Sequence, residues 1–417
     1  MASFLQRKDK MKNNKIELLA PAGDFEKLKT AIHFGADAVY FAGKNYGLRA
    51  YGTNFENMSI KETMDYIHAH GKRGYVTLNV YARHNDFDGL KDYVQTLVDA
   101  NVDAVIISDL GIFSFVHTHF PNLEIHISTQ ANTTNSYAAK MWQQLGASRV
   151  VLARELDINE IQKISKENPD LELEAFVHGA MCISYSGRCL LSNYLTNRDS
   201  NHGECVQACR WKYSVTEEQR PDDHFDLEED ERGTYIFNSK DLCLIEYLDQ
   251  ITEAGIDSLK VEGRMKSPYY VATVINAYRR ALNHLEDCRK NNKKYKVPAE
   301  LKAELEKASH RKYTTGFMFS DGNPTQNYES SIQEQSSKFM AIVLAKEDNR
   351  ILVEQRNKFA TGDSLEILSP SVEFNKLLKI DRMEDELGNE VVEARNVQQK
   401  LWIYTNQNIQ VGDILRK

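Results

Sequence analysis

The feature that most constrains this chain is a repeat in which a helix end, a small turn residue and a short apolar strand follow one another. It recurs at 34–43, 99–109, 144–155 and 253–264. Gly or Asn ends each helix, where a left-handed conformation closes the last turn. The β-branched and apolar residues that follow are typical of a strand buried on both faces. Strands that alternate with helices in this way predict a parallel sheet with helices outside it.

Eight strands are predicted, at 16–19, 38–41, 75–79, 104–108, 124–128, 149–152, 173–177 and 258–261. Amphipathic helices are clearest at 58–70 and 87–100, and the segment 269–285 follows the last strand as a closing helix. Eight such units between residues 15 and 290 favour an α/β fold of the TIM-type (β/α)8 barrel class. A doubly wound open sheet is the alternative, because counting strands does not exclude it.

The domain organisation follows from changes in pattern. We expect a disordered extension at 1–14, the barrel at 15–290, a linker with a helix (299–310) at 291–337, and a C-terminal domain at 338–417. The connection after the seventh strand, 178–256, is a long Cys-rich insertion, and loops of this length in a compact fold are usually functional. The C-terminal segment changes to short alternating strands, which is typical of a small all-β, barrel-like domain.

Composition bears on location and partners. No apolar run approaches the roughly 18 residues of a membrane span, and the first fifteen residues are polar and basic, unlike a secretory signal. These features predict a cytoplasmic protein without membrane contact. The net charge is −8, but the segment 216–232 holds nine acidic and two basic residues and supplies most of it. The remaining surface is nearly neutral, so a basic stretch such as 289–296 is still compatible with nucleic acid.

Polar and charged residues follow several of the predicted strands. In a TIM-type barrel the active site lies where strands end and βα loops begin. Five of these residues are predicted to be catalytic: Arg154, Glu155, His178, Glu262 and Arg264. The alternative for the arginines and glutamates is loop ion pairs that contribute little. The alternatives for His178 are a satisfied core histidine, or a residue that hydrogen-bonds beside a metal centre.

The cysteines indicate a specific chemistry more clearly than the charged residues at the strand ends do. The insertion carries five of them: Cys182, Cys189, Cys205, Cys209 and Cys243. In a reducing compartment, thiolates gathered on one insertion favour a soft metal or an iron–sulfur cluster. Structural zinc usually takes two close pairs, and the six-residue gap after Cys182 fits that pattern poorly, so zinc is the alternative cofactor. Unliganded buried thiols are the third possibility, and Cys288, outside the insertion, is expected to be a bystander.

Several familiar catalytic motifs are missing from the sequence. It contains no HExxH, no GxSxG elbow, no P-loop and no dinucleotide fingerprint. A cysteine–histidine peptidase dyad could combine His178 with one of several cysteines, but no spacing selects a partner.

The segment 174–192, EAFVHGAMCISYSGRCLLS, resembles the signature of the collagenase-like peptidases of unknown catalytic type, family U32. The segments LLAPAG at 18–23, GECVQACR at 203–210, NSKDLC at 238–243 and KVEGRMKS at 260–267 resemble the same family. The resemblance covers residues 15–290, and the C-terminal segment is similar to the family's C-terminal domain.

This resemblance implies more than one activity. Branches of the family are oxygen-independent hydroxylases that hold a [4Fe-4S] cluster and act on the wobble uridine of tRNA, on a ribosomal cytidine or on ubiquinone precursors, with prephenate implicated. Length and a single C-terminal module make this chain most similar to the tRNA branch, which forms 5-hydroxyuridine. The implied cluster ligands are Cys182, Cys189, Cys205 and Cys243, with Cys209 as the alternate to Cys205.

The expected partners follow from the same resemblance. They are the tRNA anticodon loop, a small anionic co-substrate such as prephenate, and a related family member as a heterodimer partner. By their positions, Arg154, Lys260 and Arg264 are expected to hold the anion, since guanidinium groups bind carboxylates in a bidentate manner. The alternatives are a collagenase-like peptidase (a hydrolase), or a non-catalytic, cluster-bearing partner of a related chain.

Overall fold

A computed structural model describes residues 15–43, 59–181, 184–186, 188–196, 198, 205–206, 208, 229–230, 233–234, 240–319 and 334–417. It confirms the barrel: eight parallel strands close on themselves because the last pairs with both the first and the seventh. In order around the ring they are β1 (Glu17–Pro21), β2 (Ala38–Phe41), β3 (Arg73–Leu78), β4 (Ala104–Ile107), β5 (Glu124–Ile127), β6 (Arg149–Val151), β7 (Glu172–Ala180) and β11 (Ser258–Val261). The open-sheet alternative is therefore wrong.

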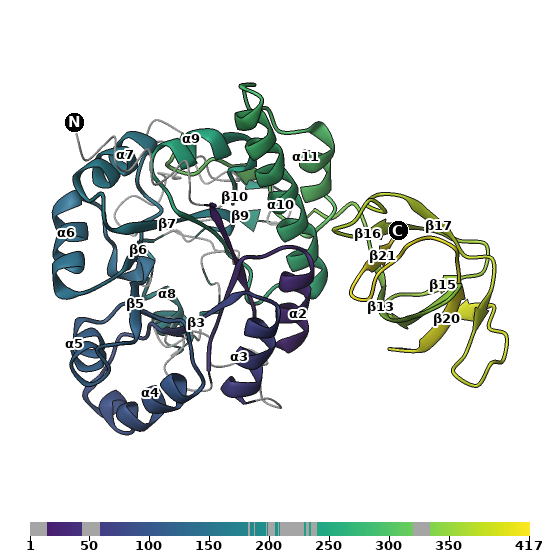
Figure 1. Ribbon diagram of the computed structural model, residues 1–417, viewed down its shortest axis with the longest axis horizontal. Helices are drawn as coiled ribbons and strands as arrows, with labels where there is room; N and C mark the ends of the chain where they lie inside the picture. Colours follow the sequence, from purple (N-terminus) through teal and green to yellow (C-terminus); the bar gives the residue numbers. More distant parts are fainter. Residues whose placement is uncertain are drawn as a thin grey trace.

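Helices cover the outside of this ring (Figure 1). They are α2 (Phe25–His33), α3 (Ile60–Ala69), α4 (Leu90–Asp99), α5 (Leu110–His119), α6 (Ser136–Leu145), α7 (Ile158–Glu167), α9 (Leu248–Glu253) and α10 (Pro268–Lys290). The short 3-10 turns η1 (His84–Phe87), η2 (Thr129–Ala131) and η5 (Ile245–Tyr247) lie in the connections. The main hydrophobic core packs between strands and helices and includes Leu18, Val105 and Leu173, none of them exposed.

Local sequence explains where the helices start. Asp24 accepts a hydrogen bond from the Lys27 backbone N–H at the start of α2. Ser59 and Asp157 form reciprocal capping boxes at α3 and α7. Ser267 caps α10, whose first residue is a proline. Such caps satisfy backbone N–H groups that the first turn of a helix leaves unpaired. They therefore fix the residue at which each of these helices begins.

The long insertion after β7 is also confirmed. Its described parts are α8 (Leu191–Thr196), the pair β8 (Glu229–Asp230) and β9 (Gly233–Thr234), and β10 (Asp241–Cys243). β10 pairs antiparallel with the end of β7, and β12 (Tyr313–Thr314) adds parallel to β10. The guanidinium of Arg188 lies 5.1 Å from the ring centre of Tyr81, just beyond β3. Since β3 and β7 are opposite each other in an eight-strand ring, the insertion reaches across the barrel mouth.

The predicted C-terminal β domain is present and has its own core, which includes Val353, Leu365 and Ile403. Its strands are β13 (Phe339–Glu347), β14 (Arg350–Gln355), β15 (Phe359–Ala360), β16 (Ser364–Leu368), β17 (Leu377–Lys379), β18 (Met383–Glu384), β19 (Glu393–Ala394), β20 (Lys400–Tyr404) and β21 (Ile414–Arg416). Seven of these form one antiparallel sheet in the order β17-β16-β21-β13-β14-β20-β18, and β15 pairs with β19.

The helix expected at 299–310 is shorter than predicted. α11 (Ala299–Leu305) ends at Leu305, and His310 instead forms a β-bridge with Glu334. Glu304, near the end of α11, accepts two hydrogen bonds from Arg416 of β21, at 2.5 and 2.7 Å, with both side chains fully buried. His33 of α2 likewise contacts Asp413 at 2.8 Å. These contacts join the C-terminal domain to the barrel side of the molecule. Figure 1 shows this domain on the side where α2, α10 and α11 lie.

Among the described residues, none of the helices combines the length and the apolar character needed to cross a membrane.

Candidate active site at the barrel mouth

Arg154 and Glu262 meet at the carboxyl ends of β6 and β11. Arg154 donates to the Ala180 carbonyl at 2.9 Å, lies 3.9 Å from a Glu262 carboxylate oxygen, and stacks 3.8 Å from the Phe176 ring centre. Tyr40 donates to the same Glu262 oxygen at 3.4 Å. The structure therefore brings together two of the predicted catalytic residues at the end of the barrel where TIM-type enzymes place their active sites.

Two buried polar atoms at this mouth lack a protein partner. Within the described part of the chain, the Nε of Arg154 and the Oε2 of Glu155 have no hydrogen-bond partner. Burial raises the pKa of Glu155, although the nearby Arg154 charge opposes this. Because buried polar groups are normally hydrogen-bonded, such atoms at the carboxyl ends of barrel strands are candidates for ligand contacts.

Arg264 and Lys260 are less available than the sequence suggested. Arg264 is 6% exposed and donates to Thr77 Oγ1 at 3.1 Å inside the barrel. Lys260 is 4% exposed, donates to Glu174 at 2.8 Å and lies 4.5 Å from the Tyr40 ring centre. Lys260 is thus already neutralised by a buried carboxylate, which leaves Arg154 as the better candidate of the three for an anionic ligand.

Gly179 shows how closely the strand ends approach one another here. Its φ is +109°, and a Cβ at this position would lie 2.5 Å from the Glu262 carbonyl oxygen. Only glycine combines that backbone conformation with that contact at low cost. The glycine in the His178–Gly179 motif therefore lets β7 and the Glu262 loop come together.

His178 occupies a second cluster, on the outer side of β7. It is 1% exposed, and its ring packs against Tyr278 of α10 (5.4 Å between ring centres) and Tyr313 of β12 (5.5 Å). It is the register partner of Cys243 in the antiparallel β7–β10 pair. Burial lowers the pKa of His178 to about 3 and raises the pKa of the Cys243 thiol to about 11.

These shifts oppose the peptidase alternative for this pair. A cysteine peptidase needs a thiolate beside an imidazolium, which requires a low thiol pKa and a histidine that holds its proton. Here both groups are held neutral near pH 7. The Nε2 of His178 is also buried without a hydrogen-bond partner among the described residues.

Of the other predicted cluster ligands, Cys189 and Cys205 lie in the described residues. Cys189 is half-buried, and Cys205 is exposed and accepts a hydrogen bond from Ser192 at 3.7 Å. Cys182 and Cys209 lie outside the described residues. In the part of the chain that the structure describes, no three His, Cys, Asp or Glu side chains are grouped to hold a metal ion. Cys288, the expected bystander, is buried on α10 beside His284.

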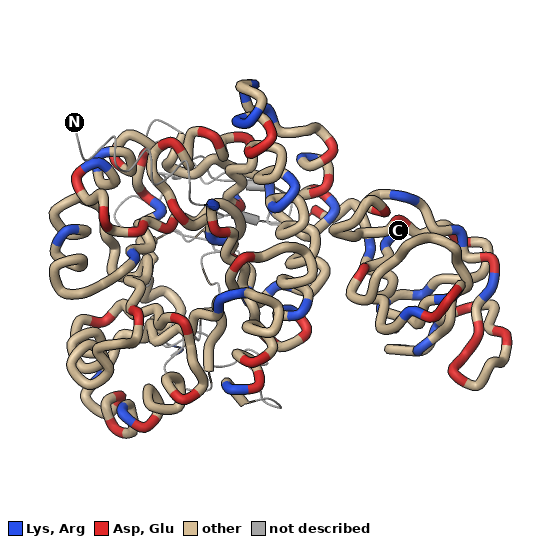
Figure 2. The backbone as a smooth tube through the Cα atoms, viewed as in Figure 1, with Lys and Arg blue, Asp and Glu red and all other residues tan. Residues whose placement is uncertain are grey.

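The basic stretch 289–296 begins at the end of α10. Arg279, the residue after Tyr278, donates to the Gly35 carbonyl in the turn that precedes β2. Arg289 donates to Thr252 of α9 at 2.5 Å, and Tyr295 donates at 2.8 Å to the carbonyl of Ile245, two residues after Cys243. Figure 2 shows Lys and Arg gathered at that end of α10. The stretch therefore lies against α9 and the residues that follow β10.

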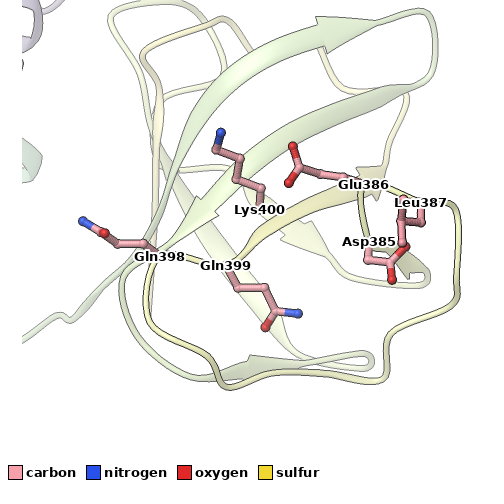
Figure 3. A pocket seen from close by; sticks show the side chains of 6 residues that line it. All are labelled: Asp385, Glu386, Leu387, Gln398, Gln399 and Lys400. Atoms are coloured by element: carbon pink, nitrogen blue, oxygen red, sulfur yellow. The ribbon is translucent and has the colours of Figure 1, made fainter.

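A pocket of about 410 Å³ lies in the C-terminal domain (Figure 3). It combines two carboxylates with one ammonium group and is lined by Asp385, Glu386, Leu387, Gln398, Gln399 and Lys400. Its mixed charge favours neither an anion nor a cation, and it is remote from the predicted site residues.

Sequence reasoning missed the tyrosines of both clusters. Tyr40 contacts Glu262, and Tyr278 contacts His178 across a sequence separation of 100 residues. The one available signal was that Tyr270 and Tyr278 are eight residues apart on one helix, which places them on similar faces. Their partners are set only by how α10 packs on β7 and β10.

Comparisons with known proteins agree with this architecture. The sequence-family model described as "Peptidase family U32" matches residues 23–328. The family model described as "Peptidase family U32 C-terminal domain" matches residues 335–416. The chain is 40% identical over 410 residues to "tRNA hydroxylation protein P1" of Bacillus subtilis, covering 97% of this chain and 95% of that protein.

Two further relatives are in Escherichia coli. "tRNA hydroxylation protein P" is 36% identical, with 95% of each chain covered. A 23S rRNA 5-hydroxycytidine synthase is 33% identical over 271 residues, covering 65% of this chain and 40% of that protein. On the extent of these matches, the chain belongs to peptidase family U32.

Proposed function

We propose that this chain is an RNA-modifying enzyme that hydroxylates the wobble uridine of tRNA to 5-hydroxyuridine without molecular oxygen. The observation that carries the proposal is full-length similarity to relatives named as tRNA hydroxylation proteins, together with a barrel mouth crossed by a Cys-rich insertion. The anticodon loop is single-stranded, so its bases can turn out toward a pocket at little unstacking cost.

The cofactor in this proposal is a [4Fe-4S] cluster held by Cys182, Cys189, Cys205 and Cys243, with Cys209 as the alternate to Cys205. The donor chemistry fits: the described cysteines of the insertion are thiols, and soft thiolates are the usual ligands of iron–sulfur clusters. When bound, the cluster would supply one-electron transfer close to the barrel mouth. Zinc remains the alternative metal for the same ligands.

The mouth residues would bind and orient the reactants. Arg154 keeps an unpartnered Nε beside a cation–π contact, so it can take a carboxylate of an anionic co-substrate such as prephenate. Burial raises the pKa of Glu155, which is the direction expected of a carboxyl group that donates a proton. Tyr40 and Arg154 fix Glu262, which can accept a hydrogen bond from the base.

The test is complementation of a strain that lacks the gene and its paralogues, with 5-hydroxyuridine in tRNA measured by mass spectrometry. Wild-type protein should restore the nucleoside, and Cys243→Ser should not. The matched control is Cys288→Ser, a cysteine outside the insertion, which should restore it.

Protein purified without oxygen should contain about four irons and four sulfides per chain. Stoichiometric zinc, or no metal, in a protein that restores the nucleoside would remove the cluster from the proposal. Failure of wild-type protein to restore the nucleoside, together with cleavage of a collagen-like peptide, would favour the peptidase alternative instead.

A further inference from the structure

The described part of the barrel exposes most of its large apolar side chains around the mouth. Two kinds of segment carry them: the loops and first helical turns that follow barrel strands, and the insertion that crosses the mouth. The exceptions are Val98, near the end of α4, and Met141, in the middle of α6. The exposed apolar side chains at the mouth include Leu110, Tyr137, Tyr185, Leu190, Tyr194 and Met265.

All the exposed aromatic rings of the described residues belong to this group. Tyr137, in the first turn of α6, and Tyr194, on α8, are each 84% exposed, and Tyr185 is 49% exposed. In the described C-terminal domain, the exposed large apolar residues are only Leu and Val. No ring contact or side-chain hydrogen bond joins Tyr137 or Tyr194 to another described residue. Apolar side chains gathered in this way at one end of a molecule mark an interaction surface.

The segments that carry these tyrosines contain no acidic residue. Neither Asp nor Glu occurs at 125–154 or at 175–198, although 60 of the 417 residues are acidic. The first segment includes α6, whose one charged residue is the exposed Lys140 (Figure 2). The second includes α8 and the exposed Arg188 and Arg198. On these two segments an anionic partner would meet cations and no carboxylate.

Exposed rings beside cations suit single-stranded RNA better than a protein partner. Lys140 follows Tyr137 by three residues on α6, so their side chains are neighbours on one helix face. Unpaired bases stack on aromatic rings, and Lys and Arg contact the phosphates between them. The core of a protein interface is instead depleted of charged residues.

We propose that Tyr137 and Tyr194 are stacking platforms for unpaired bases of the anticodon loop on either side of the target nucleotide, with Lys140 and Arg188 at the neighbouring phosphates. This inference rests on the proposed function, in which the anticodon loop is the substrate. Stacking of the flanking bases outside the mouth would help the target base to leave the loop and turn into the barrel.

The experiment measures binding of a transcribed tRNA anticodon stem–loop, with uridine at the wobble position, to full-length protein purified without oxygen. Tyr137→Leu and Tyr194→Leu should each weaken binding about fivefold or more, because stacking of one base contributes at least that much affinity. Tyr137→Phe and Tyr194→Phe keep the ring and should bind as wild type does. The salt dependence of binding should stay the same in all four variants, since no cation is removed.

Two controls separate stacking from a general loss of RNA binding. Val372→Ala changes a side chain that is 78% exposed in the C-terminal domain, and its affinity for the stem–loop should equal that of wild type. A fully paired RNA duplex should bind equally to wild type and to the leucine variants, because its bases are not free to stack on a protein ring. Tyr185 is left unchanged because it lies between Cys182 and Cys189, two of the proposed cluster ligands.

Equal affinity of wild type and both leucine variants for the stem–loop would overturn this inference and leave the proposed function intact. An equal loss in the phenylalanine variants, or on the duplex, would also overturn it, because stacking would not be the cause. Leucine variants that bind RNA normally but sediment as a smaller species than wild type would identify the surface as an interface with a second copy of the chain. The proposed function is tested separately, by 5-hydroxyuridine in the complemented strain.

Discussion

Two groups of charged residues lie inside the same barrel and differ in how well they are paired. Near the amino ends of the strands, Arg149 donates to Glu17 at 2.5 Å, to Glu172 at 2.7 Å and to Glu174 at 3.1 Å. We call the buried members of this group, Glu17, Arg149, Glu174 and Lys260, the lower network. At the opposite end, Arg154 and Glu155 each keep one buried atom without a partner among the described residues.

The difference separates a structural from a functional use of the same residue types. A buried ion pair tolerates desolvation only when its hydrogen bonds are complete, as they are for Arg149. An incomplete set costs stability and is retained where a ligand completes it. The lower network should therefore govern folding, and the mouth residues should govern activity. The predictions below test this division, beginning with the largest expected effect.

Removal of the central cation of the lower network should lower the free energy of unfolding. Arg149→Met would remove the cation that Glu17 and Glu174 share. Only Arg73 would remain beside Glu17 and only Lys260 beside Glu174, and breaking a buried pair typically costs about 3–5 kcal/mol. Urea unfolding followed by circular dichroism measures the loss. An Arg149→Met protein as stable as wild type would contradict the structural assignment of this network.

The mouth should show the opposite behaviour. Arg154→Met is expected to lower 5-hydroxyuridine formation at least tenfold, because the guanidinium that would hold the anionic co-substrate is lost. Its free energy of unfolding should fall by only about 1–2 kcal/mol, less than in Arg149→Met. The variant loses one hydrogen bond to the Ala180 carbonyl, a 3.9 Å contact with Glu262 and the stacking on the Phe176 ring. Full activity in this variant would argue that Arg154 is only a packing residue.

Acid should weaken the lower network. Burial alone would raise the pKa of Glu17, but the charges of Arg149 and Arg73 outweigh it and lower the pKa to about 2, from an ordinary value of 4.5. Stability from this group is therefore complete above about pH 4.5 and is lost as the pH falls toward 2. The loss should be about 3 kcal/mol. Unfolding measured across this range should give a flatter pH dependence in Glu17→Gln than in wild type.

The smallest effect is expected at Glu155. Burial raises the pKa of Glu155 in the folded protein above its value in the unfolded chain. The contribution of Glu155 to stability therefore falls as the pH rises from the unfolded pKa to the folded one. Glu155→Gln removes that penalty and should leave stability at pH 7 equal or higher by less than about 1 kcal/mol. Activity should nevertheless fall, as measured from 5-hydroxyuridine. A clear loss of stability would place Glu155 with the lower network instead.

The eight strands could be predicted because helix ends, turn glycines and apolar strands repeat along the chain. The strands expected at 38–41 and 258–261 coincide with Ala38–Phe41 and Ser258–Val261, and the other six differ by a few residues at their ends. The helix expected at 299–310 was too long because its last residues pair elsewhere: His310 bridges to Glu334. Helix propensity depends on neighbouring residues along the chain, so it contains no information on a β-bridge partner that is distant in the sequence.

The mouth residues could be named from strand ends, but their pairing could not. Lys260 and Arg154 both follow the barrel pattern, yet Lys260 meets Glu174 and Arg154 keeps an unpartnered nitrogen. His178 has the sequence position of a mouth residue, but its ring packs against Tyr278 and Tyr313. These outcomes depend on which side chains from distant segments face one another.

The sequence by itself determined the eight alternating strands and helices, the Cys-rich insertion and the separate β domain, because periodicity and turn residues act over short stretches of chain. That the strands close into a barrel was decided by the pairing of β11 with both β1 and β7. Only the tertiary structure decided which charges are neutralised, where the insertion crosses the mouth, and which tyrosine meets His178. The physical reason is that hydrogen bonds and burial are set by groups 25 to 244 residues apart, such as Arg149 with Glu174 and Arg279 with Gly35.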